Sequence, residues 1–302
     1  MATTSTFSSQ LNTPDLRRVF VEAGKERPLE YAEWCNVDTM EWQGVKDFQV
    51  SGMGTMPEKP EGTQFVLDQP ITGGTKTYTA IPRGKAFEVT WEGWRDELYG
   101  VFREMAAETG RAARHAQEVQ AASILNNAFS TSFTGFTASE ALVSTTHTRL
   151  DGGLNTTTAN RPSPDIGLSQ TGLQAAITRY ENMVDERGLP RLMTPTMLLV
   201  GPANKFVARE ILMSGGKPYS ADNEINALIE EDLSWMISHY FTLSTQWFLM
   251  CAKGVHDLNF LWRDPPMFDS FDDPRSKNCV YTGYERFAVG FGSYRGVDGS
   301  TG

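Results

Sequence analysis

Cysteine and histidine, the residue types that form zinc sites and reactive thiols, are few in this sequence, and they are widely spaced. Three cysteines, Cys35, Cys251 and Cys279, form no CxxC pair, and the histidines form no HExxH segment and no pair four residues apart. Because a structural zinc site needs clustered Cys and His ligands, and a disulfide framework needs paired cysteines, we predict neither. Cys251 lies in the apolar run 247–252, where a thiol is typically a small core residue. The histidines stand singly, at His115, His147, His239 and His256.

Patterns for catalysis are equally incomplete. Ser, His and Asp are all present, but no GxSxG segment places a serine on a nucleophile turn. The acidic group Asp269, Asp272 and Asp273 has the ligand type for a hard cation, yet the prolines around it predict a solvated, turn-rich loop. The segment 52–54, Gly-Met-Gly, precedes no helical pattern, so we predict a flexible loop tip there and no phosphate-binding turn. We therefore expect no catalytic residue, no metal and no cofactor.

Composition and charge narrow the class of protein. With 302 residues and 40% hydrophobic content the chain can fill a sizeable core, and its 21% charged residues are too few for a disordered chain. The net charge of -10, without any run of Lys and Arg, disfavours sequence-specific nucleic-acid binding. The sequence has no signal-peptide pattern and no apolar window long enough for a membrane span, so we expect neither export nor a membrane partner.

Glycine and proline punctuate residues 42 to 90 and exclude long helices there. Near the ends of this stretch, 45–50 and 75–81 alternate or favour β-branched and aromatic residues, which predicts two strands joined by a long irregular excursion. A two-stranded ribbon is only marginally stable in water, so we expect the excursion to reach outward to a partner. The preceding residues, 1 to about 30, are too polar to fold alone and are typical of an arm.

The strongest helical period lies between Trp94 and Phe129. Apolar residues recur at intervals of three, four or seven from Leu98 to Val119, and charged residues keep the same rhythm on another face. An amphipathic helix from Leu98 to Phe129 would be roughly 48 Å long, enough to cross a whole domain.

The C-terminal half interleaves helices and strands without a regular βαβ repeat. Ser169 is a candidate N-cap for a second helix, which Gly188 and Pro190 would end. The apolar run 197–200 predicts a buried strand, followed by a short helix that ends near Met213. Further strand-like runs lie at 247–252 and 287–291. This order predicts an α+β fold.

Three segments, taken in order, carry a family resemblance: the long helix 98–129, the segment 188–202 with its Gly-Leu-Pro and Gly-Pro pairs, and the C-terminal region 284–296. In this order they resemble the major capsid proteins of tailed double-stranded DNA bacteriophages, and the likeness spans essentially the whole chain. It implies the Hong Kong 97-type fold, with an N-terminal arm, an extended β-hairpin loop, a long spine helix, and peripheral and axial domains. It also implies a structural subunit that is not an enzyme.

The resemblance divides the chain and assigns contacts. It places the arm at 1–41, the extended loop at 42–91, the peripheral domain with the spine helix at 92–195, the axial domain at 196–258, and the return to the peripheral domain at 259–302. Subunits of this family assemble into hexamers and pentamers of an icosahedral or prolate head, in which the loop of each overlies the next. The residues that we expect at contacts between copies are Lys46, Lys59, Lys76, Arg83, Phe20 and Trp42.

Partners follow from the same resemblance. Only about 30 residues precede the loop region, and with Met1 present this favours a separate scaffolding protein, with a portal and a decoration protein as further partners. The virion capsid, assembled in the cytoplasm of a host bacterium, would hold double-stranded DNA non-specifically, and its acidic wall would repel that DNA modestly.

Some members of the family cross-link a loop lysine to an asparagine of a neighbour. Lys59 or Lys76, with Asn278 and Glu285, supplies the residue types, but nothing in the sequence places them together, so we expect non-covalent locking. Two alternatives remain open. One is a nanocompartment shell protein of the same fold, which encloses cargo enzymes, and the other is a soluble cytosolic hydrolase.

Overall fold

The computed structural model describes residues 4–302 except 97–99, 153, 156–158, 217–224 and 277. The elements are, in order, α1 (Thr4–Lys25), α2 (Tyr31–Trp34), β1 (Asn36–Thr39), β2 (Gly44–Val50), β3 (Thr72–Thr79), β4 (Ile81–Val89), α3 (Trp91–Asp96), α4 (Val101–Asn126), β5 (His147–Thr148), β6 (Leu154–Asn155), α5 (Gln170–Glu181), β7 (Pro195–Val200), η1 (Pro202–Asn204), α6 (Lys205–Met213), η2 (Ala227–Ile229), β8 (Ser234–Ile237), β9 (Trp247–Cys251), β10 (Leu258–Asp272), β11 (Cys279–Phe291) and β12 (Val297–Ser300). Within the described residues, every helix is too short or too polar to traverse a membrane.

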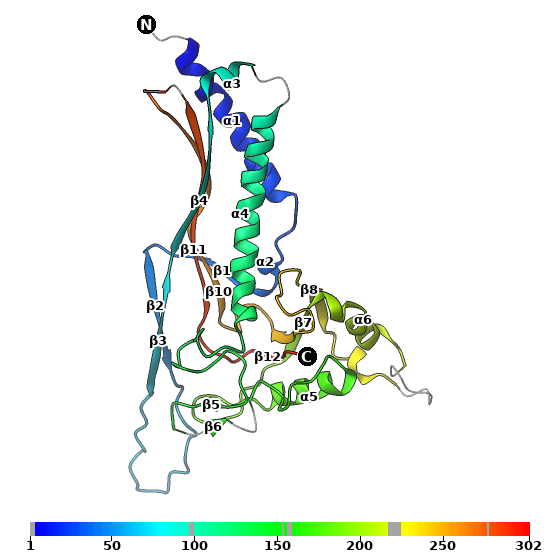
Figure 1. The fold of residues 1–302 in the computed structure, drawn as a ribbon. Coiled ribbons are helices and arrows are strands. Elements are labelled where there is room, and N and C mark those ends of the chain that lie inside the picture. Colours follow the sequence, from blue (N-terminus) through cyan, green and yellow to red (C-terminus); the bar gives the residue numbers. More distant parts are fainter. Residues whose placement is uncertain (1–3, 97–99, 153, 156–158, 217–224, 277) are drawn as a thin grey trace.

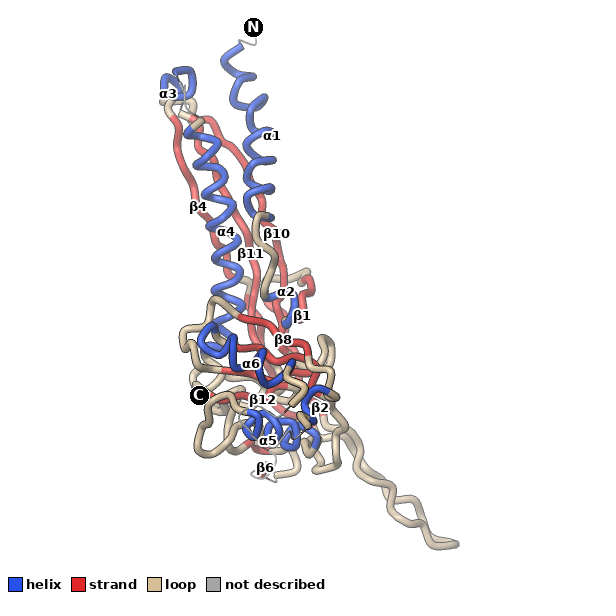
Figure 2. Tube along the Cα trace, turned by 90° about the vertical axis from the view of Figure 1, so that its right-hand side faces the viewer, coloured by secondary structure: helices blue, strands red, loops and turns tan. Residues whose placement is uncertain are grey.

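A long helix on a narrow sheet forms the elongated part of the molecule (Figure 1). The sheet has the order β1-β10-β11-β4, and the antiparallel pair of β10 and β11 runs along its length. The 26-residue helix α4 packs on β11, and α1 lies beside α4 and packs on β10 (Figure 2). Leu16 and Phe20 of α1 are buried in a core that they share with Phe268 and Tyr281 of the sheet. The polar N-terminal arm is thus held by the few apolar side chains that it has.

A second sheet, with the order β12-β9-β7-β8, forms a lobe at one end of α4. Side chains of a strand point alternately to its two faces. On one face Leu198 and Trp247 join a core with Leu173 of α5, and on the other Leu199 and Phe248 join a core with the end of α4. The sheet is therefore buried on both faces, which is why β7 and β9 are continuous apolar runs in the sequence.

The strands β2 and β3 form an antiparallel hairpin beside the elongated part, with a register from Gly44 opposite Thr79 to Val50 opposite Thr72. Residues 51–71, which we call the excursion, connect them. A hydrogen bond from the Ser51 amide to the Ile71 carbonyl oxygen (2.9 Å) closes the base of the excursion. Beyond it the chain projects from the body as a long, narrow loop (Figure 2).

Several predicted elements are confirmed. The helix α4 matches the predicted long helix, although it begins at Val101, and Leu98 lies outside the described residues. Ser169 caps α5 as predicted, since its Oγ accepts a hydrogen bond from the amide of Gly172 at 3.1 Å. The hairpin strands, β7, α6 and β9 also lie where the sequence patterns place them.

The prediction of a solvated, turn-rich loop around Asp269 and Asp272 is wrong. Both residues belong to β10, a 15-residue strand that continues through Pro265 and Pro266. The pairing of β10 with β11 shifts register between Trp262 and Asp264, and again between Asp264 and Met267. Because proline lacks an amide hydrogen, a strand accepts it at such an irregularity, and the prolines mark bulges in this strand rather than its end.

The boundaries expected from the resemblance do not follow the packing at three places. Strand β4, expected within the extended loop, pairs with β11 in the elongated sheet. Helix α5, expected in the peripheral domain, packs in the lobe. Strand β12, expected to return to the peripheral domain, pairs with β9 of the lobe.

Candidate assembly surfaces

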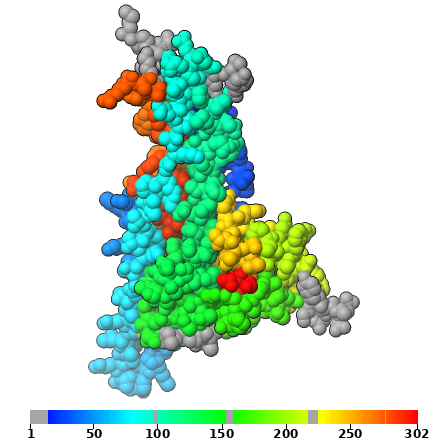
Figure 3. All heavy atoms as spheres, viewed as in Figure 1, coloured from blue at the N-terminus to red at the C-terminus, as the bar shows by residue number. Residues whose placement is uncertain are grey.

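The excursion carries apolar side chains that its own chain leaves uncovered. Met56 is 97% exposed, and Phe65, Val66 and Leu67 are 81%, 71% and 93% exposed. The segment has no regular structure, and it protrudes at one end of the molecule (Figure 3). A run of exposed apolar residues on a protruding segment is typical of a protein–protein contact.

The hairpin that carries the excursion is fixed to the body by close contacts. A Cβ atom at Gly74 of β3 would lie 2.0 Å from the backbone oxygen of Phe136, so only glycine permits this approach. Tyr78 of β3 is buried, and its hydroxyl accepts a hydrogen bond from Nδ2 of Asn259 at 3.3 Å. The hairpin is therefore a stiff base from which the excursion extends.

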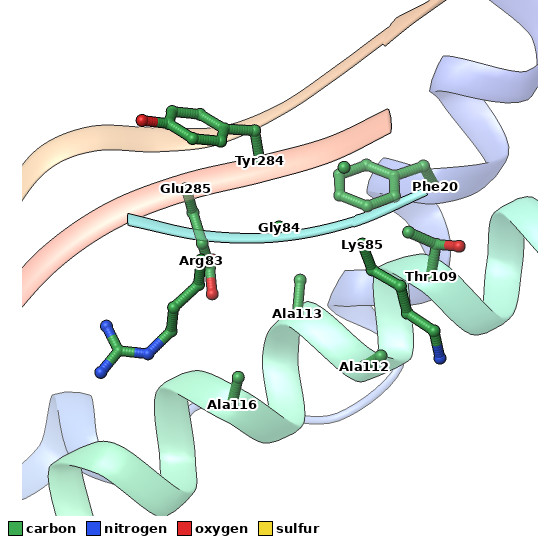
Figure 4. A pocket seen from close by; sticks show the side chains of 11 residues that line it. Phe20, Arg83, Gly84, Lys85, Thr109, Ala112, Ala113, Ala116, Tyr284 and Glu285 are labelled. Carbon is green, nitrogen blue, oxygen red and sulfur yellow. The ribbon is translucent and has the colours of Figure 1, made fainter. Parts of the chain in front are cut away.

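A hollow of about 160 Å³ lies between α4 and the strands β4 and β11 of the sheet (Figure 4). Its floor is made of small residues, Ala112, Ala113 and Ala116 of α4 and the glycines of β4 and β11, which leave space between the helix and the sheet. Arg83 and Lys85 of β4 give it a positive rim.

Glu285 of β11 lines the same hollow and is almost completely buried. One carboxylate oxygen accepts a hydrogen bond from Nε2 of Gln117 (2.7 Å), and the other has no partner among the described residues. Burial raises the pKa of Glu285, and the hydrogen bond from Gln117 and the charges of Arg83 and Arg114 partly oppose this rise.

The predicted contact residues lie in different settings. Trp42 is 73% exposed at the start of the hairpin region, and Lys46 and Lys59 are exposed, with the Lys59 ammonium 4.8 Å from the ring centre of Phe65. These positions are open to a neighbouring copy. Lys76 instead donates a hydrogen bond to the carbonyl oxygen of Thr134 in its own chain, and burial lowers its pKa.

Two further candidates face their own chain. The Arg83 guanidinium lies over the ring of Phe287, 4.2 Å from its centre. Phe20 is 3% exposed and stacks on Phe268 with ring centres 5.1 Å apart. The expectation for Phe20 is therefore corrected, because its side chain is part of the core that joins α1 to the sheet.

The residue types considered for a cross-link are not brought together within one chain. Asn278 lies in the turn between β10 and β11 and donates a hydrogen bond to Glu88 (2.5 Å), at the opposite end of the molecule from the excursion that carries Lys59 (Figure 1). In the part of the chain that the structure describes, no three His, Cys, Asp or Glu side chains are grouped to hold a metal ion.

The apolar side chains of the excursion are not among the predicted contact residues. Lys59 is the predicted contact there, although the run Phe65-Val66-Leu67 stands in a segment whose glycines and prolines already predict an exposed loop. An apolar triplet in a predicted exposed loop is the signal that points to these residues.

Several solved structures share the fold of this chain. The capsid of the cyanophage P-SCSP1u is similar, with a TM-score of 0.58 at 12% identity over 90% of this chain and 88% of that chain. The procapsid protein of bacteriophage JBD30 has a TM-score of 0.52 at 15% identity, over 100% of this chain and 76% of that chain. A virus-like particle from Pyrococcus furiosus has a TM-score of 0.52 at 11% identity, over 95% and 98%. At identities this low, the structural similarity establishes the fold alone.

That fold, with its spine helix on a long sheet, its lobe and its protruding hairpin, is the Hong Kong 97-type fold of capsid shell proteins. The family model for phage capsid protein matches residues 74–297, and the chain belongs to this family of structural proteins. Among curated proteins no sequence matches the chain significantly.

Proposed function

We propose that this capsid protein builds the hexamers and pentamers of an icosahedral or prolate phage head that encloses double-stranded DNA. In this proposal the lobe, including α5 and β12, is the axial domain that surrounds the centre of each ring. The elongated part, with α4 and the β10–β11 pair, is the peripheral domain. The excursion of each copy lies over the peripheral domain of the next.

The observation that carries this proposal is the exposure of Met56, Phe65, Val66 and Leu67 on a segment that leaves the body of its own chain. A neighbouring copy that covers them removes apolar surface from water, which is worth about 25 cal/mol per Å². One such contact is weak, but a closed shell repeats it in every copy and raises the effective concentration of each remaining contact. The shell is then stable without a covalent cross-link.

The same proposal covers the partners. A separate scaffolding protein, a portal and a decoration protein would act with this chain in the cytoplasm of the host bacterium. With a net charge of -10, the shell wall would hold the packaged DNA without specific contacts and repel it modestly.

Replacing the apolar triplet tests the role of the excursion. The variant Phe65→Ser/Val66→Ser/Leu67→Ser should keep the circular dichroism of the wild type, because these side chains contribute little to its own core. It should fail to give closed particles in electron microscopy and should sediment as small oligomers. The control variant Phe65→Leu/Val66→Ile/Leu67→Met keeps the apolar surface and should form particles. Normal shells from the serine variant would contradict the proposal.

A nanocompartment shell remains the second candidate, because the virus-like particle from Pyrococcus furiosus and the JBD30 procapsid match the fold with the same TM-score of 0.52. The contents of native particles distinguish a phage head from a nanocompartment. Particles that contain double-stranded DNA support the phage head, and particles that contain a cargo protein and no DNA support the nanocompartment. The family assignment leaves the hydrolase alternative without support.

A further inference from the structure

A tight turn between α5 and β7, residues 184–190, lies against the base of the excursion. One carboxylate oxygen of Asp185 accepts hydrogen bonds from the amides of Arg187 (2.8 Å) and Leu189 (2.9 Å). Gly188 has the left-handed conformation, with φ of 77°, that such a turn requires. The turn is therefore closed by hydrogen bonds of its own, and these hold the backbone of Arg187 in one place.

Arg187 binds both sides of the excursion. Its Nε donates to Oγ of Ser51 (3.3 Å) on the outgoing side, and its Nη1 and Nη2 donate to Oδ1 of Asp68 (3.2 Å) and the carbonyl oxygen of Gln69 on the returning side. The other oxygen of Asp68 accepts from the amide of Gly54 (2.7 Å), so the two sides are also joined to each other. A planar guanidinium with five donors is suited to such a three-way contact, which a lysine cannot reproduce.

The neighbouring side chain anchors the turn to the body. Glu186 accepts a hydrogen bond from Nε2 of Gln49 on β2 (2.5 Å) and one from the amide of Leu150 (3.2 Å). It also pairs with Arg295, which is 2% exposed and whose Nε donates to the carbonyl oxygen of Val184 at 2.8 Å. The buried Arg295 thus fixes the turn to the body of the molecule, and Glu186 joins the turn to strand β2 of the hairpin.

Beyond this point the excursion has hydrogen bonds of its own, such as Thr63 to Pro60, but its described hydrogen bonds to the rest of the chain come from Arg187. The tip extends roughly 30 Å past the contact if about nine residues are extended at about 3.3 Å each. A small change of direction at Arg187 therefore displaces the tip, residues 58–62, by several ångströms and turns the apolar triplet 65–67, which directly precedes Asp68, with it.

We propose that the turn 184–190 is a clamp that sets the direction in which the excursion leaves the molecule, and that Arg187 is its positioning residue. This inference rests on the proposed function, in which the tip must meet a neighbouring copy. The clamp makes the reach of the excursion a property of the single subunit, fixed before assembly.

The test measures the direction of the excursion in the unassembled full-length subunit. Spin labels at Gln64→Cys in the excursion and Lys205→Cys on α6 report one distance, with Cys279→Ser removing the more accessible native thiol. Arg187→Met should widen the distance distribution roughly twofold, because the excursion loses the hydrogen bonds that join it to the lobe. Its circular dichroism and melting midpoint should stay close to wild type, since partly exposed ion pairs add little to stability.

Two further variants complete the test. Arg187→Lys keeps the charge but loses the planar guanidinium with its several donors. Its distance distribution should be intermediate in width between those of the wild type and Arg187→Met. Arg209→Met, which removes an exposed arginine of α6, should match wild type. An unchanged distribution in Arg187→Met would overturn the clamp, whatever its effect on shells. A widened distribution with normal shells would leave the clamp in place and overturn the assembly role of the excursion instead.

Discussion

Buried ionisable side chains join elements that are far apart in this chain. Arg179 of α5 forms a bidentate pair with the fully buried Asp298 of β12, at 2.8 and 3.0 Å. Glu118 of α4 accepts hydrogen bonds from the amides of Glu30 (2.8 Å) and Tyr31 (3.2 Å), and so attaches the end of the arm to the spine helix. Each oxygen of these two carboxylates accepts one hydrogen bond, which lowers the cost of burying the charge.

The Glu118 contact makes stability depend on pH. Burial raises the pKa of Glu118 from 4.5 to about 6, and the two backbone hydrogen bonds only partly oppose this. Because the folded chain holds this proton more tightly than the unfolded chain, the contribution of Glu118 is complete below about pH 4.5 and is lost as the pH rises through about 6. The loss amounts to roughly 2 kcal/mol.

Urea unfolding of the wild type and of Glu118→Gln over this pH range measures the effect. The free energy of unfolding of the wild type should fall more steeply with rising pH than that of Glu118→Gln, which cannot ionise. Glu22→Gln, at an exposed position of α1, is the matched control and should keep the wild-type slope. Parallel curves for the wild type and Glu118→Gln would show that the buried carboxylate does not titrate in this range.

At the scale of elements, the packing of α1 on α4 depends on one glycine. A Cβ atom at Gly110 of α4 would lie 2.3 Å from the backbone oxygen of Phe20 in α1, a distance that requires the helices to move apart. In an open helix, alanine is better than glycine by about 1 kcal/mol. The close packing of α1 on α4 at Gly110 therefore has to stabilise the fold by more than the helix propensity that alanine would add.

Gly110→Ala should lower the free energy of unfolding by roughly 1–3 kcal/mol, the usual range for overpacking, despite the gain in helix propensity. Limited proteolysis should also release the segment of α1 faster than in the wild type. Gly167→Ala is the control, because a Cβ atom there meets nothing within 4 Å. A more stable Gly110→Ala variant would mean that α1 can separate from α4 without cost.

Elements whose signals are local could be predicted from the sequence, and those fixed by distant contacts could not. The period of α4 and the Ser169 cap of α5 lie within a few residues, and both are found in the structure. Strand β10 was missed because Pro265 and Pro266 break its pattern, while its pairing with β11 supplies the order that the local sequence lacks. The clamp was equally hidden, since Arg187 and Asp68 are 119 residues apart and neither belongs to a motif.

At the scale of the whole molecule, the protruding excursion favours association between copies and the net charge opposes it. The exposed excursion offers apolar surface to a second copy, whereas a net charge of -10 makes every copy repel the next. Raising the ionic strength from about 0.01 M to about 0.15 M shortens the Debye length from roughly 30 Å to roughly 8 Å. Repulsion over the whole molecule is then screened, while apolar contacts are not weakened.

We therefore expect salt to promote assembly of the purified subunit. Light scattering and electron microscopy should show few particles at about 0.01 M salt and many more at about 0.15 M or above. The triple serine variant of the excursion should show no such rise, because screening alone does not supply the apolar contact. Particles that form at low salt and dissolve at high salt would contradict this account, since they would show that ion pairs between copies, rather than the apolar excursion, hold the shell together.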